Sequence, residues 1–196
     1  MDKDKKYKVK NQKYNYLILL FGHNSSGKST ISKEMLKYFE LSRVNGDEIR
    51  EFLKDKINYF KDSNYSYPNE KISKVNILVT QLRIDLIKEL INSNQNILID
   101  GSGIKKSARK KFTQLVKDNK KYKTIIIETK ISEIELLKRL MKRDLSNSND
   151  KWVYHYEEFR KERYESLSKS EGDFCLEYNQ KNLDELILNL KEIINN

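Results

Sequence analysis

The stretch Phe21–Thr30, which reads FGHNSSGKST, decides the fold of this chain. It follows the apolar run Tyr16–Phe21, whose length and continuity predict a strand that is buried on both faces. Beyond it, apolar residues recur at helical spacing over Ile31–Phe39. The chain has only six glycines in 196 residues, and two of them, Gly22 and Gly27, lie between this strand and this helix. Glycine adopts positive φ angles readily, so the link is expected to be a tight turn.

The turn fits the pattern G-x-x-x-x-G-K-[ST], the signature of a phosphate-binding loop. In such a loop the backbone N–H groups turn inward onto phosphate oxygens, and the following helix adds the positive end of its dipole. Lys28 would reach the β- and γ-phosphates, and the Ser29 hydroxyl would coordinate Mg²⁺. ATP and Mg²⁺ are therefore the expected cofactors, and His23, at a variable position, is expected to be structural. The expected nucleotide-binding residues are Gly22, Asn24, Ser25, Ser26, Gly27, Lys28, Ser29 and Thr30, with Ser29 as the metal ligand. The alternative is a glycine turn with a solvated lysine.

The composition favours a protein that folds inside the cell. The single cysteine, Cys175, cannot form an intrachain disulfide. The N-terminus is too charged to begin a secretory signal. The longest apolar run has six residues, far fewer than the roughly 20 that a membrane helix needs. We therefore expect a cytoplasmic protein with no membrane partner.

The net charge of +10 suggests an anionic partner, such as nucleic acid or a phosphorylated small molecule. Lysines nevertheless occur along the whole length, and charge spread in this way serves solubility equally well. The charge alone does not decide between these two explanations.

Strand-like and helix-like segments alternate along the chain, which predicts an α/β fold with a parallel sheet covered on both faces by right-handed crossovers. The expected strands are 16–21, 41–44, 96–100, 124–128 and 173–178. The expected helices begin near 28 and 47 and otherwise span 70–91, 105–117, 132–143, 153–168 and 182–194. Residues 51–69 are less regular and are expected to form a loop or a broken helix.

Asp47 and Arg50 follow the second expected strand, at the sheet edge where the phosphate loop also lies. A carboxylate in this place can accept the proton of an acceptor hydroxyl as it attacks the γ-phosphate. Arg50, one helical turn on, can hold an anionic group of the acceptor. Alternatively, Asp47 caps the helix and Arg50 is an ordinary surface residue.

Asp100 ends the third expected strand, next to the phosphate loop. Its carboxylate could contact Mg²⁺ through water, or orient Lys28 or an acceptor. The alternative is a turn aspartate that contacts no ligand.

Arg139 and Arg143 stand four residues apart and therefore share one face of a helix. The polar stretch 144–150 follows and is expected to be mobile. Arginines on a mobile flap can close over the transferring phosphate and stabilise its charge. Alternatively, they are surface residues that serve solubility.

The known classes of P-loop protein narrow the choice. A guanine-specific GTPase would carry Asn-Lys-x-Asp near a late strand, and the sequence has no such motif. The chain is too short for a motor and shows no transporter signature. A small kinase is the class that remains.

The motifs GHNSSGKST, VNGDEIR, NILIDGSG and LLKRLMKRD together resemble the phage-type 5′-polynucleotide kinases and related small P-loop kinases of the zeta-toxin and chloramphenicol phosphotransferase types. The resemblance runs from about residue 16 to 145. It implies a five-stranded sheet of order 2-3-1-4-5, with Asp47 as general base for a 5′-hydroxyl. It also implies that Arg50 binds a neighbouring nucleic-acid phosphate and that Arg139 and Arg143 belong to a lid.

The chain departs from these kinases in two respects. It lacks the Asp-x-Asp-x-Thr motif of the phosphatase module that many of them carry, and Arg109 is only an approximate counterpart of their arginines in the segment after Asp100. The expected substrate-binding residues are Arg50, Asp100 and Arg109. By this reading, residues 1–15 are a basic flexible tail and 16–196 form one P-loop kinase domain, with its lid at about 139–152.

Three functions remain open. The first is an ATP-dependent kinase that phosphorylates the 5′-hydroxyl of a DNA or RNA end, in which Tyr65, Tyr67 or Trp152 could stack on a base. The second is a kinase for a small molecule such as a nucleoside, a sugar nucleotide or an antibiotic. The third is a nucleotide-dependent binding module without phosphotransfer.

Overall fold

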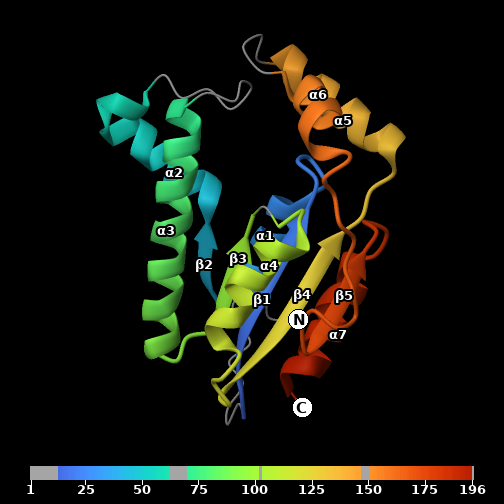
Figure 1. Cartoon of the computed structure of the whole chain (residues 1–196). Helices are drawn as coiled ribbons and strands as arrows, with labels where there is room; N and C mark the ends of the chain where they lie inside the picture. Colours follow the sequence, from blue (N-terminus) through green and yellow to red (C-terminus); the bar gives the residue numbers. More distant parts are fainter. Residues whose placement is uncertain (1–12, 62–69, 102, 147–150, 196) are drawn as a thin grey trace.

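Five parallel strands form one sheet at the centre of the molecule (Figure 1). The computed structural model describes residues 13–61, 70–101, 103–146 and 151–195. The sheet order is β2-β3-β1-β4-β5, and every neighbouring pair is parallel, which confirms the predicted fold class. The strands are β1 Asn15–Gly22, β2 Ser42–Asn45, β3 Ile97–Asp100, β4 Tyr122–Thr129 and β5 Phe174–Tyr178.

Strand β1 is the central strand, and its apolar run is buried on both faces. Leu17 aligns with Ile97 of β3 and with Thr124 of β4. Side chains alternate along the strand, so that Leu17, Leu19 and Phe21 join one apolar cluster, and Tyr16, Ile18 and Leu20 join the other. All six are at most 2% exposed, which explains why the run shows no polar alternation.

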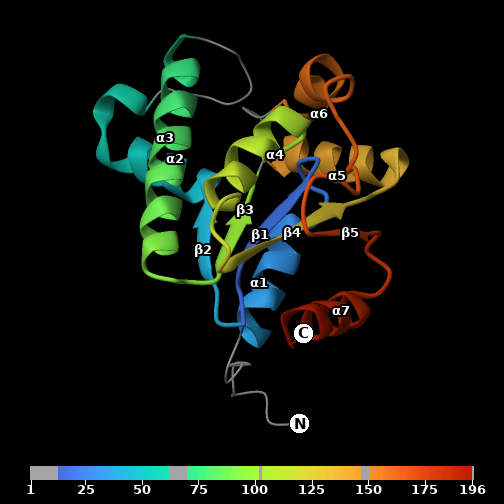
Figure 2. The same ribbon diagram turned by 60° about the horizontal axis from the view of Figure 1, so that its bottom comes forward.

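Helices cover both faces of the sheet. Helices α1 (Lys28–Tyr38) and α7 (Leu183–Asn195) pack on one face, and α3 (Glu70–Asn92) and α4 (Lys106–Thr113) pack on the other (Figure 2). In the described part of the chain, no helix combines the length and the apolar character that a bilayer crossing requires.

Two helical arms rise above the carboxyl ends of the strands (Figure 1). In the first arm, α2 (Gly46–Lys56) packs on α3 through Leu53. The second arm, called the lid arm here, consists of α5 (Glu133–Ser146), α6 (Trp152–His155) and the π-helical turn η3 (Tyr156–Arg160). Its own small apolar cluster joins α5 to Tyr156. Short 3₁₀ turns, η1 (Asn58–Phe60) and η2 (Gln114–Val116), complete the described elements.

The prediction of one helix over 153–168 is wrong, because the helical path ends at Arg160. The chain then runs as a loop whose backbone bonds to the sheet side of the molecule: the Glu165 N–H donates to the Ile104 carbonyl, and the Leu167 N–H donates to the Glu128 carboxylate at 3.1 Å. Tyr164 also donates to Glu128, at 2.8 Å. The N–H groups of Glu165 and Leu167, which would bond within a continuous helix, are satisfied by these tertiary hydrogen bonds instead.

The alternative in which Asp47 caps helix α2 is also wrong. Asn45 is the N-cap, and its side-chain oxygen accepts from the N–H groups of Asp47 and Glu48 at 2.8 and 3.1 Å. Asp47 therefore lies in the first turn of α2, and its side chain is 80% exposed. Its carboxylate accepts from Arg50 instead of capping the helix.

Arg109, a predicted substrate-binding residue, lies in the interior and is 0% exposed. Its guanidinium donates twice to Glu171, at 2.7 and 2.9 Å, and its other three bonds go to backbone carbonyls. It also lies 4.2 Å from the centre of the Phe21 ring. All five donors of the guanidinium are thus used inside the fold.

Replacement of Arg109 tests this structural role. Arg109→Met leaves the Glu171 carboxylate buried without its partner, so the free energy of unfolding should fall by about 3–5 kcal/mol. Urea denaturation measures the change. Lys110, the exposed residue that follows Arg109, provides the control: Lys110→Met should leave the free energy of unfolding nearly unchanged. Equal stabilities for the two variants would contradict the buried pair.

Candidate active site

The phosphate loop joins β1 to α1 in a conformation that only glycine allows at two positions. Gly22 has φ 151°, and a Cβ atom there would lie 2.1 Å from the Oγ1 atom of Thr129 and 2.8 Å from its carbonyl oxygen. Gly27 has φ 88° and forms the N-cap of α1. The first glycine therefore meets a steric limit set by β4, and the second sets the start of the helix.

Thr129, at the end of β4, fixes the loop from behind. Its hydroxyl donates to the Phe21 carbonyl at 3.0 Å, so Ser26 is the donor in the 2.6 Å contact between the Ser26 and Thr129 hydroxyls. Gln180 donates to the Ser26 carbonyl at 2.7 Å. The predicted nucleotide-binding residue Ser26 is itself 0% exposed, so its side chain anchors the loop.

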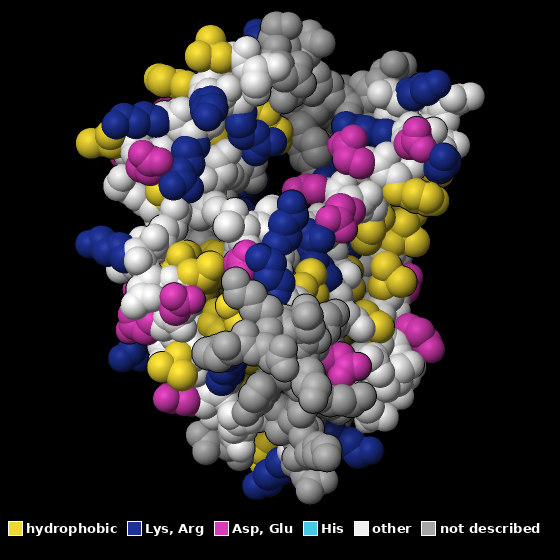
Figure 3. All heavy atoms as spheres, turned by 180° about the vertical axis from the view of Figure 1, so that it is seen from behind, with side chains coloured by type: hydrophobic (Ala, Val, Ile, Leu, Met, Phe, Trp, Pro, Cys, Tyr) yellow, Lys and Arg dark blue, Asp and Glu magenta, His cyan; other side chains and the backbone are white. Residues whose placement is uncertain are grey.

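A cavity of about 640 Å³ lies between the two arms and has the phosphate loop as part of its wall. The space-filling view shows this hollow between the arms, with lysine and arginine side chains around it (Figure 3). The structure brings eight predicted site residues to its wall. These are Asn24, Ser25, Lys28, Ser29, Asp47, Arg50, Asp100 and Arg143.

Lys28 is held inside the loop, where its ammonium donates to the carbonyls of Gly22 and His23. The pKa of Lys28 is lowered to about 8, first by burial and then by the positive charge of Arg160. Asp100 and Asp47 raise it, but by less. Both carboxylates are therefore close enough to Lys28 to interact with its charge.

Asp47 and Arg50 meet on the first turns of α2. The Asp47 carboxylate accepts from Arg50 at 2.7 Å, and Arg50 also donates to the side chain of Asn76 on α3 at 3.0 Å. The Arg50 side chain is only 12% exposed, and burial lowers its pKa. Helices α2 and α3 thus hold the Arg50 guanidinium beside the exposed carboxylate of Asp47.

Asp100 is held firmly at the end of β3. Its Oδ2 atom accepts from Arg43 Nε and Nη2 at 3.0 and 2.7 Å, and from the Asn45 amide at 3.1 Å. The residue is 1% exposed, yet it belongs to the wall of the cavity. Its carboxylate therefore has a fixed position close to Lys28 and Ser29.

The two predicted lid arginines both reach the phosphate loop. Arg139 donates to the Ser25 carbonyl at 3.3 Å and to Glu135 at 2.8 Å. Arg143 donates to the Ser25 hydroxyl at 3.4 Å, and its guanidinium lies 4.1 Å from the centre of the Trp152 ring. Arg143 lines the cavity, whereas Arg139 lies outside the described wall.

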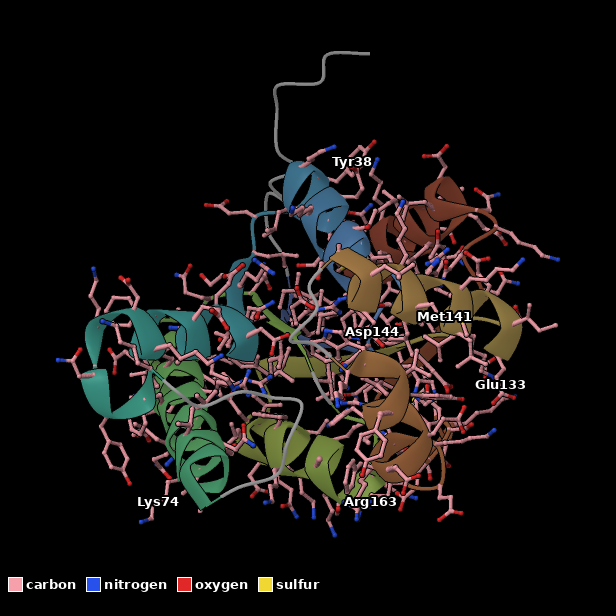
Figure 4. All side chains as sticks on the ribbon, turned by 90° about the horizontal axis from the view of Figure 1, so that it is seen from above. Tyr38, Lys74, Glu133, Met141, Asp144 and Arg163 are labelled. Atoms are coloured by element: carbon pink, nitrogen blue, oxygen red, sulfur yellow. The ribbon has the colours of Figure 1, made fainter. Side chains whose placement is uncertain are left out.

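Asp144 joins the two helices of the lid arm. Its carboxylate accepts from the N–H groups of Trp152 and Val153 at 2.6 and 3.1 Å, and it lies between α5 and α6 in the view from above (Figure 4). Trp152 lies in the cavity wall, and Arg143 covers one of its faces. The other aromatic residues proposed for stacking, Tyr65 and Tyr67, lie outside the described residues.

Sequence reasoning missed Arg160, the last residue of η3. This residue lines the cavity, and among the described residues its Nε and Nη2 atoms have no hydrogen-bond partner. It is also the charge with the largest effect on the pKa of Lys28. In the sequence it looks like one charged residue on the surface of a regular helix, and no local signal separates it from Arg163.

His23 is a structural residue of the loop. Its ring stacks on Tyr164 at 4.0 Å between centroids and meets the edge of Tyr156 at 5.2 Å. Its pKa is lowered to about 4, mainly by burial and then by the charge of Arg160. The ring is therefore neutral at physiological pH and joins the loop to the lid arm by packing.

A larger cavity of about 840 Å³ lies at the opposite edge of the sheet, where β1 and β4 begin. Lysines of α4, of the following loop and of β4 line it, such as Lys110, Lys117 and Lys123. It contains neither the loop nor Asp47, so its size does not make it a candidate active site.

The residues present fit a nucleotide with Mg²⁺. The Ser29 hydroxyl and the Asp100 carboxylate are oxygen donors in one wall, beside the loop amides and Lys28. Within the described residues, no group of three or more His, Cys, Asp and Glu side chains could hold a metal alone. Mg²⁺ commonly binds through one or two protein oxygens together with substrate phosphates, so the site agrees with that mode of binding.

Comparison with known families and structures agrees with this geometry. A family model described as an AAA domain (AAA_33) matches residues 17–163. A search of the curated proteins finds no significant match to the sequence.

Several solved structures share the fold over almost the whole chain. A candidate kinase from Chloroflexus aurantiacus J-10-fl has a TM-score of 0.71 and 15% identity, covering 92% of this chain and 98% of its own. A sugar kinase from Janibacter sp. HTCC2649 has a TM-score of 0.60 and 13% identity, covering 93% and 96%. A gluconokinase from Sinorhizobium meliloti 1021 has a TM-score of 0.58 and 16% identity, covering 93% and 95%.

The lowered pKa of Lys28 predicts how ATP affinity depends on pH. A triphosphate favours the protonated ammonium, but in the free protein this group loses its proton near pH 8. Binding above that pH must take up a proton, so the affinity should fall by about tenfold per pH unit there and change little below it. Calorimetric titration with ATP from pH 6.5 to 9.5 measures this dependence.

Removal of the Arg160 charge should raise the pKa of Lys28 and move the onset of this fall to higher pH. Arg160→Met is the variant. Arg163→Met is its control, because Arg163 is exposed in the same cavity wall and is not among the charges that shift the pKa of Lys28. An affinity that stays flat across the range, or the same onset in both variants, would contradict the assigned electrostatics.

Proposed function

Since the chain belongs to this AAA domain family, a family of P-loop folds, we propose that it is an ATP-dependent kinase. It transfers the γ-phosphate to a hydroxyl acceptor, and the acceptor is the 5′-hydroxyl of a polynucleotide. One observation carries the proposal: a single cavity holds the phosphate loop with Lys28, the exposed carboxylate of Asp47, and arginines from both arms. Donor phosphates and an acceptor hydroxyl can therefore meet in one place.

The residues divide the reaction between positioning and charge neutralisation. The loop amides and Lys28 hold the triphosphate, while Mg²⁺, with Ser29 as its protein ligand, supplies charge neutralisation when bound. The acceptor oxygen attacks the γ-phosphorus, its proton passes to Asp47, and the bond to the β-phosphate oxygen breaks to release ADP. Arg143 and Arg160 approach from the lid arm and stabilise the charge on the transferring group.

Two observations favour a polynucleotide acceptor. Arg50 is held beside Asp47, where it can bind a phosphate next to the attacking hydroxyl. The net charge of +10 favours an extended anionic partner. The resemblance of the four sequence motifs to 5′-polynucleotide kinases supports the same acceptor.

A small-molecule acceptor is the second candidate. The structures of a sugar kinase and a gluconokinase each match 93% of this chain, although identities of 13% and 16% relate them to it by fold alone. Salt dependence separates the two candidates. Binding of a polynucleotide should weaken steeply with salt through counterion release, whereas a compact neutral acceptor should respond little.

Transfer of label from γ-labelled ATP tests the proposal directly. The acceptors are 5′-hydroxyl DNA and RNA oligomers, nucleosides, common sugars and gluconate, each assayed at low and high salt. Labelled oligomer that forms faster at low salt supports the proposal. Label on sugars or gluconate alone would select the small-molecule kinase, and ATP binding with no labelled product would select a non-catalytic binding module.

Replacement of the proposed base should separate chemistry from nucleotide binding. Asp47→Asn removes the proton acceptor, so the transfer rate should fall by about 10²–10⁴-fold while the affinity for ATP remains nearly intact. Asp55→Asn, an exposed aspartate of the same helix, should leave both unchanged. Transfer that persists in Asp47→Asn would show that another group takes the proton.

A further inference from the structure

Arg83 is a buried arginine at the acceptor side of the active-site cavity. It comes from α3, is 5% exposed, and its guanidinium lies 4.6 Å from the centre of the Phe112 ring. Its head group reaches the ends of β2 and β3. A Cβ atom on Gly46 would lie 3.2 Å from Arg83 Cδ, and one on Gly101 would lie 3.4 Å from Arg83 Nη2. The two glycines thus leave room for the guanidinium at the cavity wall.

Within the described residues, the Nε and Nη2 atoms of Arg83 have no hydrogen-bond partner. Two other arginines near the strands differ from it: Arg43, whose side chain is 16% exposed, bonds to Asp100 and Glu48, and the buried Arg109 bonds to Glu171. Burial of a guanidinium without an anion is costly, and it is tolerated where a ligand supplies the missing charge.

The charged groups around Arg83 leave an anion as its natural partner. Burial lowers its pKa to about 10, Asp47 and Asp100 raise it, and Arg50 lowers it, so the group stays protonated. The nearby carboxylates already bond elsewhere: Asp47 to Arg50 and Asp100 to Arg43. Arg83 and Arg50 therefore add positive charge to the same wall, next to Asp47.

We propose that Arg83, together with Arg50, forms an anion subsite that holds a phosphate of the acceptor beside the attacking hydroxyl. This inference rests on the proposed kinase function and adds a second arginine to the phosphate contact proposed there for Arg50. The acceptor is a hydroxyl compound with a phosphate a few bonds away, as in a nucleoside 3′-phosphate unit at the end of a polynucleotide. Arg83 acts as a specificity-determining residue, since the chemistry at the hydroxyl falls to Asp47.

Matched acceptors test the subsite. Thymidine and thymidine 3′-phosphate present the same 5′-hydroxyl and differ in one phosphate. The intact protein should phosphorylate thymidine 3′-phosphate with a kcat/KM at least about tenfold higher. Arg83→Met, which retains apolar contact with Phe112, should remove most of this preference through KM, with little change for thymidine or for the KM of ATP.

Two further measurements keep the test decisive. Thermal unfolding should show that Arg83→Met is as stable as the intact protein or more stable, because the buried charge is gone. Lys88→Met, an exposed lysine on the same helix, should change neither the preference nor the stability. An unchanged preference in Arg83→Met, or a large loss of stability with the preference retained, would overturn the subsite.

Binding in the presence of ADP separates this inference from the kinase function. With the phosphate loop filled by ADP, thymidine 3′-phosphate should bind the intact protein and bind Arg83→Met at least about tenfold more weakly. If this difference appears without phosphate transfer, the subsite stands and the kinase proposal fails. If a sugar phosphate replaces the nucleotide with the same dependence on Arg83, the subsite stands and the polynucleotide acceptor fails. Equal binding to both proteins overturns the subsite.

Discussion

The close approach of Gly22 to Thr129 is the constraint on which the site depends. With only 2.1 Å between a Cβ at position 22 and the Thr129 hydroxyl oxygen, no side chain fits where β1 passes into the phosphate loop. The same hydroxyl bonds to the Phe21 carbonyl and to Ser26, so β4 both restricts and supports the loop. Pairing of β1 with β4 therefore places the loop amides, and through Gly27 it also sets the start of α1.

The cavity wall carries more positive than negative side chains. Its wall carries one lysine and five arginines against three carboxylates: Lys28, Arg50, Arg83, Arg143, Arg160 and Arg163 against Asp47, Glu51 and Asp100. Asp100 is fixed by Arg43 and Asn45, whereas Asp47 is largely exposed. The Asp100 carboxylate thus stabilises the arrangement of the strand ends, whereas the Asp47 carboxylate pairs with Arg50 at the solvent-exposed side of the cavity. An excess of positive charge at half-buried positions is suited to ligands with several phosphates.

Much of the fold follows from local sequence patterns, and the part that does not depends on contacts between distant residues. The apolar run of β1 and the glycine spacing predicted the central strand, the loop and the first helix correctly. The buried position of Arg109 was not predicted because its partner, Glu171, is 62 residues away and no local pattern connects them. Arg83 and Arg160 were missed because an arginine on an amphipathic helix looks the same whether it faces water or a cavity. The end of the helical path at Arg160 likewise depends on a distant residue. Glu128 of strand β4 accepts hydrogen bonds from Tyr164 and Leu167 in the loop that follows.

A crystal structure with Mg²⁺, a non-hydrolysable ATP analogue and a short 5′-hydroxyl oligonucleotide tests the central claim most directly. The account predicts that the triphosphate lies on the amides of the Gly22–Ser29 loop, with its terminal phosphate between Lys28 and the arginines of the lid arm. The 5′-oxygen should lie within hydrogen-bond reach of Asp47, at about 2.6–3.2 Å. A triphosphate bound outside the loop, or an Asp47 carboxylate turned away from the terminal phosphate, would contradict it.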